Sequence, residues 1–123
     1  MTKGGPNGLA HLRVKFSDDF YVGPGRADLL DGIAATGSIS AAGKQMGMSY
    51  KRAWSLVQAL NEGFGAPLVE ASRGGAGQGG ASLTADGVFV LERYRAMQAA
   101  TRKAIAADVT AIAKRLGDIA RKK

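Results

Sequence analysis

The sequence predicts an α/β fold that is mostly helical, and three observations support this prediction. Three segments between residues 26 and 60 carry apolar residues at helical spacing, and glycines separate them. A glycine-rich stretch between two short apolar runs then predicts a β-hairpin, and a long helical segment follows it. Two short helices joined by a tight turn and followed by a hairpin are typical of a winged helix-turn-helix. We expect that fold, with an N-terminal strand and a long C-terminal helix for dimerisation.

Length and composition exclude several classes of protein. The 123 residues suffice for one domain, expected at 10–84 between a flexible leader (1–9) and a terminal helix (85–123). With no cysteine and one histidine, the chain is expected to have no metal site, no cofactor and no enzymatic activity. No apolar stretch reaches the ~20 residues of a membrane span, and the first residues lack the apolar core of a signal peptide. We therefore expect a cytoplasmic protein.

The segment before the first helix predicts one strand. In HLRVKF, which starts at His11, apolar and charged residues alternate with the period of a half-buried strand. Asp18 and Asp19 predict a turn, and the Gly-Pro-Gly at 23–25 separates this segment from the first helix.

Capping residues set the boundaries of the first two helices. The first is predicted over 26–36, with Gly37 at its C-terminal end and an apolar face made of Ala27, Leu30, Ile33 and Ala34. Ser38 or Ser40 then offers a side-chain oxygen to cap a short second helix that runs to Met46.

The third helix is predicted to be amphipathic, starting at the capping residue Ser49. Its apolar face consists of Ala53, Val57 and Leu60. Its polar face consists of Lys51, Arg52, Ser55 and Gln58. Trp54 adjoins the apolar face, and we interpret it as a buried anchor in preference to a residue that stacks on DNA.

The glycine run at 74–80 contains the pattern G-x-G-x-x-G, which holds a pyrophosphate in dinucleotide-binding folds. That function requires a buried parallel strand before the glycines and a helix directly after them. Here the flanking runs 68–70 and 81–83 predict two strands of a hairpin, and Thr84 caps the helix that follows. We therefore interpret the glycines as the tip of the wing.

The distribution of charge predicts where DNA binds. The net charge is +7, and the segment 33–61 contains three basic residues and no acidic residue. A solvated helix face could carry the same charges, but the order of the elements favours a helix that enters the major groove. Lys51 or Arg52 is the preferred reader of a guanine edge. The predicted DNA-contacting residues are Ser38, Ser40, Ser49, Tyr50, Lys51, Arg52, Ser55, Gln58, Arg73, Gly75, Gly77 and Gln78.

The terminal helix carries an apolar seam of about two heptads, with charged residues outside it. The seam consists of Ile105, Val109, Ile112, Leu116 and Ile119. It is narrow, and no Trp or Phe follows Phe89, so pairing between two protomers explains it better than a membrane surface does. Residues 92–123 contain 9 Lys or Arg and 3 Asp or Glu. This excess of positive charge is suited to binding DNA phosphates that flank the main contact, or to keeping the protein soluble.

Residues 10–100 resemble the N-terminal DNA-binding domain of molybdate-dependent regulators of the ModE family and, more distantly, LysR-type winged helices. The matching segments are GSISAAGKQMGMSYKRAWSLVQALN (37–61), Leu-Val-Glu (68–70), the glycine run and Leu-Thr (83–84). The resemblance implies a dimer that places the third helix in the major groove of a palindromic operator.

Family members also carry C-terminal molybdate-binding modules of small β-barrel type, whereas no strand-rich segment follows the long helix before Lys123. Three modes of control therefore stay open: constitutive action, another signal, or a separate effector-binding protein. The alternative to a sequence-specific regulator is an architectural or adaptor module that binds nucleic acid without strong sequence preference.

Overall fold

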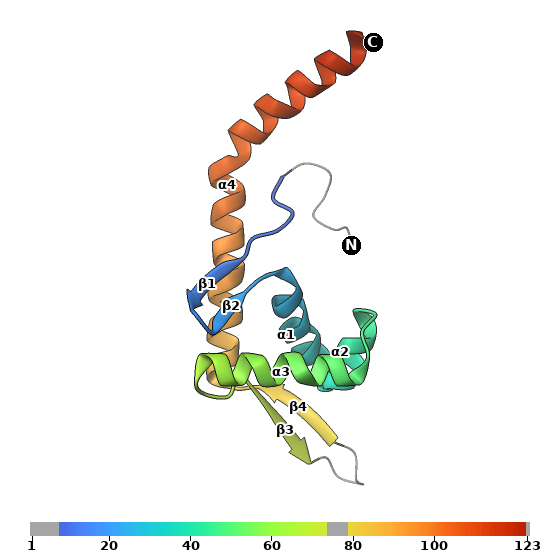
Figure 1. Ribbon diagram of the computed structural model, residues 1–123, viewed down its shortest axis with the longest axis vertical. Coiled ribbons are helices and arrows are strands. Elements are labelled where there is room, and N and C mark those ends of the chain that lie inside the picture. The colour runs from blue at the N-terminus through green and yellow to red at the C-terminus, as the bar shows by residue number, and fades with distance from the viewer. Residues whose placement is uncertain (1–7, 74–78, 123) are drawn as a thin grey trace. The chain divides into compact units, whose positions relative to one another are not determined.

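The computed structural model describes residues 8–73 and 79–122 (Figure 1). The elements are β1 (Val14–Ser17), β2 (Phe20–Val22), α1 (Pro24–Thr36), α2 (Ile39–Gln45), α3 (Tyr50–Phe64), β3 (Val69–Arg73), β4 (Gly79–Leu83) and α4 (Ala85–Lys122). They fall into two compact units. Residues 13–94 form one unit, with all the strands, the three shorter helices and the start of α4. Of the described residues, 8–12 and 95–122 belong to the other. The mostly helical fold with a hairpin wing, expected from the sequence, is confirmed.

The N-terminal strand forms a hairpin with a second strand that the sequence did not predict. β1 begins at Val14, and it pairs antiparallel with β2 through Val14↔Val22 and Lys15↔Tyr21. The predicted turn at 18–19 joins the two strands. Phe20 and Val22 of β2 are buried, so the short strand is held by its contribution to the core.

Two arginines enclose the Tyr21 ring, and one of them, Arg26, connects the hairpin to α1. The guanidinium carbons of Arg13 and Arg26 each lie 3.8 Å from the centre of the Tyr21 ring. Two guanidinium groups at that distance cannot share one face of a ring, so Tyr21 is sandwiched between them. Arg26 also donates a hydrogen bond from Nη1 to the Tyr21 carbonyl oxygen over 3.3 Å.

α1 starts at Pro24, two residues before the predicted boundary, because proline has the backbone angle of a first helical position. Gly37 ends the helix in the left-handed conformation, with φ of 72°, as predicted. Ala34, expected on the apolar face, is exposed; the buried residues of α1 are Ala27, Leu29, Leu30 and Ile33.

α2 and α3 pack closely at a glycine. A Cβ atom placed on Gly43 would lie 2.7 Å from the Ala53 Cβ, so the two helices approach at a distance that only glycine permits. The turn between them contains Gly47, whose φ is 74°. Ser38 caps α2 and Ser49 caps α3, as expected.

The wing consists of β3 and β4, which pair antiparallel from Val69↔Leu83 to Arg73↔Gly79. Both strands extend further toward the glycine run than the predicted 68–70 and 81–83. At the base of the wing, Thr84 donates its backbone N–H to the Leu68 carbonyl oxygen, and its Oγ1 accepts a hydrogen bond from Gly87. The second bond is the predicted cap of α4.

The first turns of α4 contribute to the core of residues 13–94, and its later turns are largely exposed. Leu91 and Tyr94 are buried. Of the apolar seam, Ile105 and Val109 are half-buried, whereas Ile112 and Leu116 are 70% and 67% exposed. None of the described helices is long and apolar enough to cross a membrane.

Candidate nucleic-acid interface

The face of α3 opposite the core is polar and exposed. Ala53, Val57 and Leu60 are buried, as predicted for the apolar face. Lys51, Arg52, Ser55 and Gln58 are all exposed, and Tyr50 in the first turn is 57% exposed. A helix with this division of residues can dock its buried face on the domain and present the other face to a groove of DNA.

Three of the predicted serine contacts lie at the starts of α2 and α3. The Ser38 Oγ accepts a hydrogen bond from the Ala41 backbone N–H over 3.0 Å, and the Ser49 Oγ accepts one from Arg52 over 3.1 Å. Each hydroxyl still has its own hydrogen to donate, for example to a phosphate oxygen. Ser40 lies in the first turn of α2 and is exposed.

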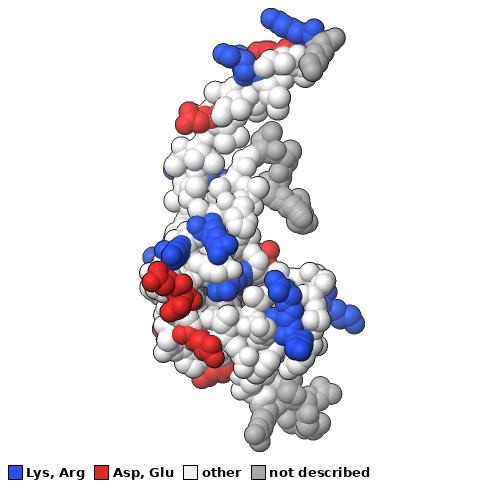
Figure 2. All heavy atoms as spheres, viewed as in Figure 1, with Lys and Arg blue, Asp and Glu red and all other residues white. Residues whose placement is uncertain are grey.

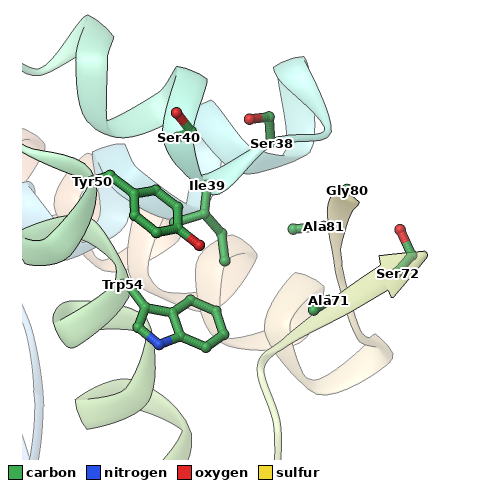
Figure 3. Close-up of a pocket in the computed structure, with 9 residues that line it drawn as sticks. All are labelled: Ser38, Ile39, Ser40, Tyr50, Trp54, Ala71, Ser72, Gly80 and Ala81. Atoms are coloured by element: carbon green, nitrogen blue, oxygen red, sulfur yellow. The ribbon is translucent and has the colours of Figure 1, made fainter. Parts of the chain in front are cut away.

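A cleft of about 310 Å³ lies between the two helices and the wing (Figure 3). We call it the wing cleft. Its lining comprises Ser38, Ile39 and Ser40 at the start of α2, Tyr50 and Trp54 on α3, and Ala71, Ser72, Gly80 and Ala81 on the wing. The two aromatic rings face the wing residues across the opening, and the Tyr50 hydroxyl points toward the cleft (Figure 3). Among the residues that the structure describes, the lining therefore combines hydroxyl groups with apolar surface and includes no charged side chain.

Backbone contacts fix the two sides of the wing cleft. The Ala81 N–H of β4 donates to the Gly37 carbonyl oxygen over 2.8 Å, which ties the wing to the turn before α2. A side chain at Gly80 would meet the Ser72 Oγ at 3.0 Å and the Gly37 carbonyl oxygen at 3.3 Å. Glycine at position 80 therefore lets the wing approach this turn closely.

Sequence reasoning missed the role of Trp54 and Ser72 in this surface. Trp54 is half-buried where a fully buried anchor was expected, because part of its ring lines the wing cleft. Its position four residues after Tyr50 places both rings on one side of α3, which was a usable signal. Ser72 carried no signal, since its place depends on the pairing Ser72↔Gly80 within the wing.

The structure brings together some of the predicted contact residues and does not describe others. Ser38, Ser40 and Tyr50 meet in the wing cleft, and Ser49, Lys51, Arg52, Ser55 and Gln58 lie on the exposed side of α3 or at its start. The backbone of Arg73 belongs to β3, but its side chain lies outside the described residues. Gly75, Gly77 and Gln78 lie outside them as well.

The charge of this surface favours a polyanion. Figure 2 shows Lys and Arg side chains over α2 and the start of α3, and Asp and Glu side chains toward the other end of α3. The acid-free segment 33–61 includes all of α2 and most of α3. Within the described parts of the chain, no group of three or more His, Cys, Asp or Glu residues could hold a metal ion.

Two helices joined by a glycine turn, an exposed basic second helix and an adjacent hairpin define a winged helix-turn-helix. More specifically, the chain belongs to the lysR family of bacterial regulatory helix-turn-helix proteins, because the model of that family matches residues 26–88. The match extends from α1 through the wing to the start of α4.

Curated relatives confirm the predicted resemblance to ModE regulators. The DNA-binding transcriptional dual regulator ModE of Escherichia coli (strain K12) is 38% identical over 93 residues, which are 76% of this chain and 36% of that protein. The molybdenum-pterin-binding protein MopB of Rhodobacter capsulatus is 46% identical over 82 residues, 67% of this chain and 30% of that protein. The chain thus spans about a third of the length of the curated relatives it matches.

A solved structure supports the same fold. Full-length CbnR in complex with its target DNA matches with a TM-score of 0.50 and 27% sequence identity. The match covers 78% of this chain and 27% of that one.

Proposed function

We propose that this chain is a sequence-specific DNA-binding transcriptional regulator that places α3 in the major groove. The observation that carries the proposal is the exposed, acid-free first half of α3, which adjoins the wing across the wing cleft. Lys51 or Arg52 reads a guanine edge, and Ser55 and Gln58 add shorter contacts. The backbone phosphates are bound by Ser38, Ser40, Ser49, Tyr50, Gly75, Gly77 and Gln78, and Arg73 either adds charge beside the phosphates or enters the minor groove. Such a protein acts in the cytoplasm, at the nucleoid.

The proposed assembly is a homodimer on a palindromic operator. The later turns of α4 leave three seam residues exposed, since Ile112, Leu116 and Ile119 are each at least half exposed. A second copy of α4 would bury these residues, together with Ile105 and Val109, as the a and d positions of a coiled coil. Two-fold symmetry in the protein then matches two-fold symmetry in the DNA.

We further propose that the target genes belong to molybdenum metabolism. This proposal rests on the similarity to ModE and to the molybdenum-pterin-binding proteins MopA and MopB. The proposal includes the three modes of control that the sequence leaves open, which are constitutive action, another signal, and a separate effector-binding protein.

Selection of DNA from a random-sequence library by the full chain tests the regulatory function. We expect a palindromic consensus, and a selected duplex that binds at least ~10³-fold more tightly than random DNA at physiological salt. Molybdate-transport promoters among bound genomic fragments would support the molybdenum link.

The excess of basic residues at 92–123 favours one alternative function, an architectural module that binds DNA without strong sequence preference. That alternative predicts no consensus and a steep loss of affinity with salt on every sequence.

A further inference from the structure

Exposed aromatic rings gather where the C-terminal end of α3 meets the β1–β2 hairpin. The centre of the Phe20 ring lies 5.7 Å from that of Phe16 and 5.5 Å from that of Phe64. Phe20 is buried, whereas Phe16 is 49% exposed and Phe64 is 37% exposed. One buried ring therefore supports two outer rings that are open to solvent.

Carboxylate groups adjoin these rings. A side chain at Gly63 would clash with the Asp19 carbonyl oxygen, so the turn of the hairpin lies against the last turn of α3, next to Glu62. Lys15 pairs with Asp18 over 3.4 Å. Within the described residues, neither the Asp19 nor the Glu62 carboxylate has an ion-pair partner, and both residues are exposed. Figure 2 shows Asp and Glu side chains toward this end of α3.

We propose that this region docks an arginine-bearing segment of a partner protein. We call the region the acidic aromatic patch, and it consists of Phe16, Asp18, Asp19, Glu62 and Phe64. Arginine fits both components of the patch, because a guanidinium group stacks on aromatic rings and donates paired hydrogen bonds to a carboxylate. The inference goes beyond the proposed function and does not rest on it, since the docking involves no DNA.

The hairpin itself contains an example of this stacking. The Tyr21 ring lies between the guanidinium groups of Arg13 and Arg26, each 3.8 Å from its centre. A lysine ammonium group is more strongly hydrated and cannot form the paired hydrogen bonds, so it fits the patch less well. The patch also adjoins the C-terminal end of α3, which is capped by Gly65 and carries the negative end of the helix dipole. Both features favour a guanidinium group as the occupant.

The charge and position of the patch argue against other occupants. Carboxylates repel the phosphates of DNA and of anionic lipids. The exposed seam of α4 already provides the surface for the proposed dimer, and it lies outside residues 13–94. Tyr50 and Phe64 are the first and last residues of α3, which places their Cα atoms about 20 Å apart. The patch therefore stays open to a protein partner while the first turn of α3 is in the major groove.

A labelled peptide tests the docking. The probe is a short fluorescein-labelled peptide of repeated Arg-Ala-Leu, and its anisotropy is measured as the full chain is added. The chain carries a net charge of +7, so general electrostatic attraction disfavours this peptide, and binding reports a local acidic surface. We expect the arginine peptide to bind at least about threefold more tightly than the same peptide with lysine in place of arginine. Absence of binding, or equal binding of the two peptides, overturns the inference.

Charge variants locate the binding site of the peptide. Asp19→Asn and Glu62→Gln each remove one charge with little change of shape, and each should weaken binding of the arginine peptide about threefold. The matched control is Asp108→Asn, which removes the same charge from an exposed position on α4 and should leave binding unchanged. If Asp108→Asn weakens binding as much as Asp19→Asn, the peptide responds to overall charge and the patch is not its site.

Phe16→Leu tests the aromatic contact. Leucine keeps apolar contact with Phe20 but lacks a ring face, so the preference for the arginine peptide over the lysine peptide should fall to about one. The variant should also bind a selected duplex and dimerise within about twofold of the wild type. If it instead shifts the dimer dissociation constant and keeps the arginine preference, the patch contacts a second copy and the inference is overturned. Failure of the wild type to bind any selected duplex contradicts only the proposed function, because the peptide assay contains no DNA.

Discussion

The side chain of Asn61 and the backbone of Val69 are joined by two hydrogen bonds. The Asn61 Nδ2 donates to the Val69 carbonyl oxygen over 3.1 Å, and its Oδ1 accepts from the Val69 N–H over 3.2 Å. The same oxygen accepts from the Leu68 N–H over 2.8 Å. One amide in the last turns of α3 thereby anchors the base of the wing to the helix proposed to contact DNA.

Asn61→Ala is expected to lower the free energy of unfolding by about 2–3 kcal/mol, because Leu68 and Val69 are buried and their N–H groups would lose their acceptor. Urea denaturation measures the change. Glu62→Ala is the control, since it replaces an exposed neighbour on α3 and should change stability by less than about 0.5 kcal/mol. If the Asn61 variant is as stable as the wild type, water molecules take over the hydrogen bonds of the amide without lowering the free energy of unfolding.

Gly43→Ala is expected to destabilise the contact between α2 and α3. The added methyl group would lie 2.7 Å from the Ala53 Cβ and 3.3 Å from the Met48 Cγ, and overpacking of this kind costs about 1–3 kcal/mol. Thermal unfolding followed by circular dichroism gives the change. Gly25→Ala adds the same methyl group to α1 where no atom lies within 4 Å, so it should leave stability unchanged or raise it slightly. If the Gly43 variant is as stable as the wild type, α2 shifts to make room for the methyl group without lowering the free energy of unfolding.

The sequence predicted the elements whose ends depend on local signals. Ser38, Ser49 and Thr84 accept the expected capping hydrogen bonds, and Gly37 adopts the left-handed conformation that a C-terminal cap needs. The amphipathic pattern of α3 was equally readable, because helical spacing fixes which residues share a face. The N-terminal partner strand β2 was missed, since three residues carry too little pattern to separate a strand from a turn.

The sequence predicted candidate-site residues on single elements, including Ser38 and Ser40 at the start of α2, but not the cleft that these elements form together. The exposed residues of α3 follow from sequence spacing, whereas the wing cleft depends on contacts between residues 38–54 and 71–81. Asn61 illustrates the same limit. A polar residue near the end of a helix has no pattern that reveals backbone partners seven and eight residues later, just before and at the start of a strand.

Arg52→Ala is expected to lower sequence discrimination by ~1–3 kcal/mol, the value of a base-edge contact. The measurement compares dissociation constants for a selected duplex and for variants with one substituted base pair. Arg102→Ala removes the same charge from an exposed position on α4, so it should leave discrimination unchanged. If Arg52→Ala instead weakens binding uniformly across sequences, Arg52 contacts phosphate and another residue reads the base.

Leu116→Lys is expected to weaken self-association. Leu116 is 67% exposed in the single chain, and dimerisation through the seam would bury it in apolar surroundings where an unpaired ammonium group is unfavourable. Sedimentation equilibrium over a range of concentrations measures the dimer dissociation constant, which we expect to rise by about tenfold or more. Ala107→Lys is the control, because residue 107 is exposed on the side of α4 opposite the seam and receives the same charge. An unperturbed Leu116→Lys dimer would place the interface elsewhere on the chain.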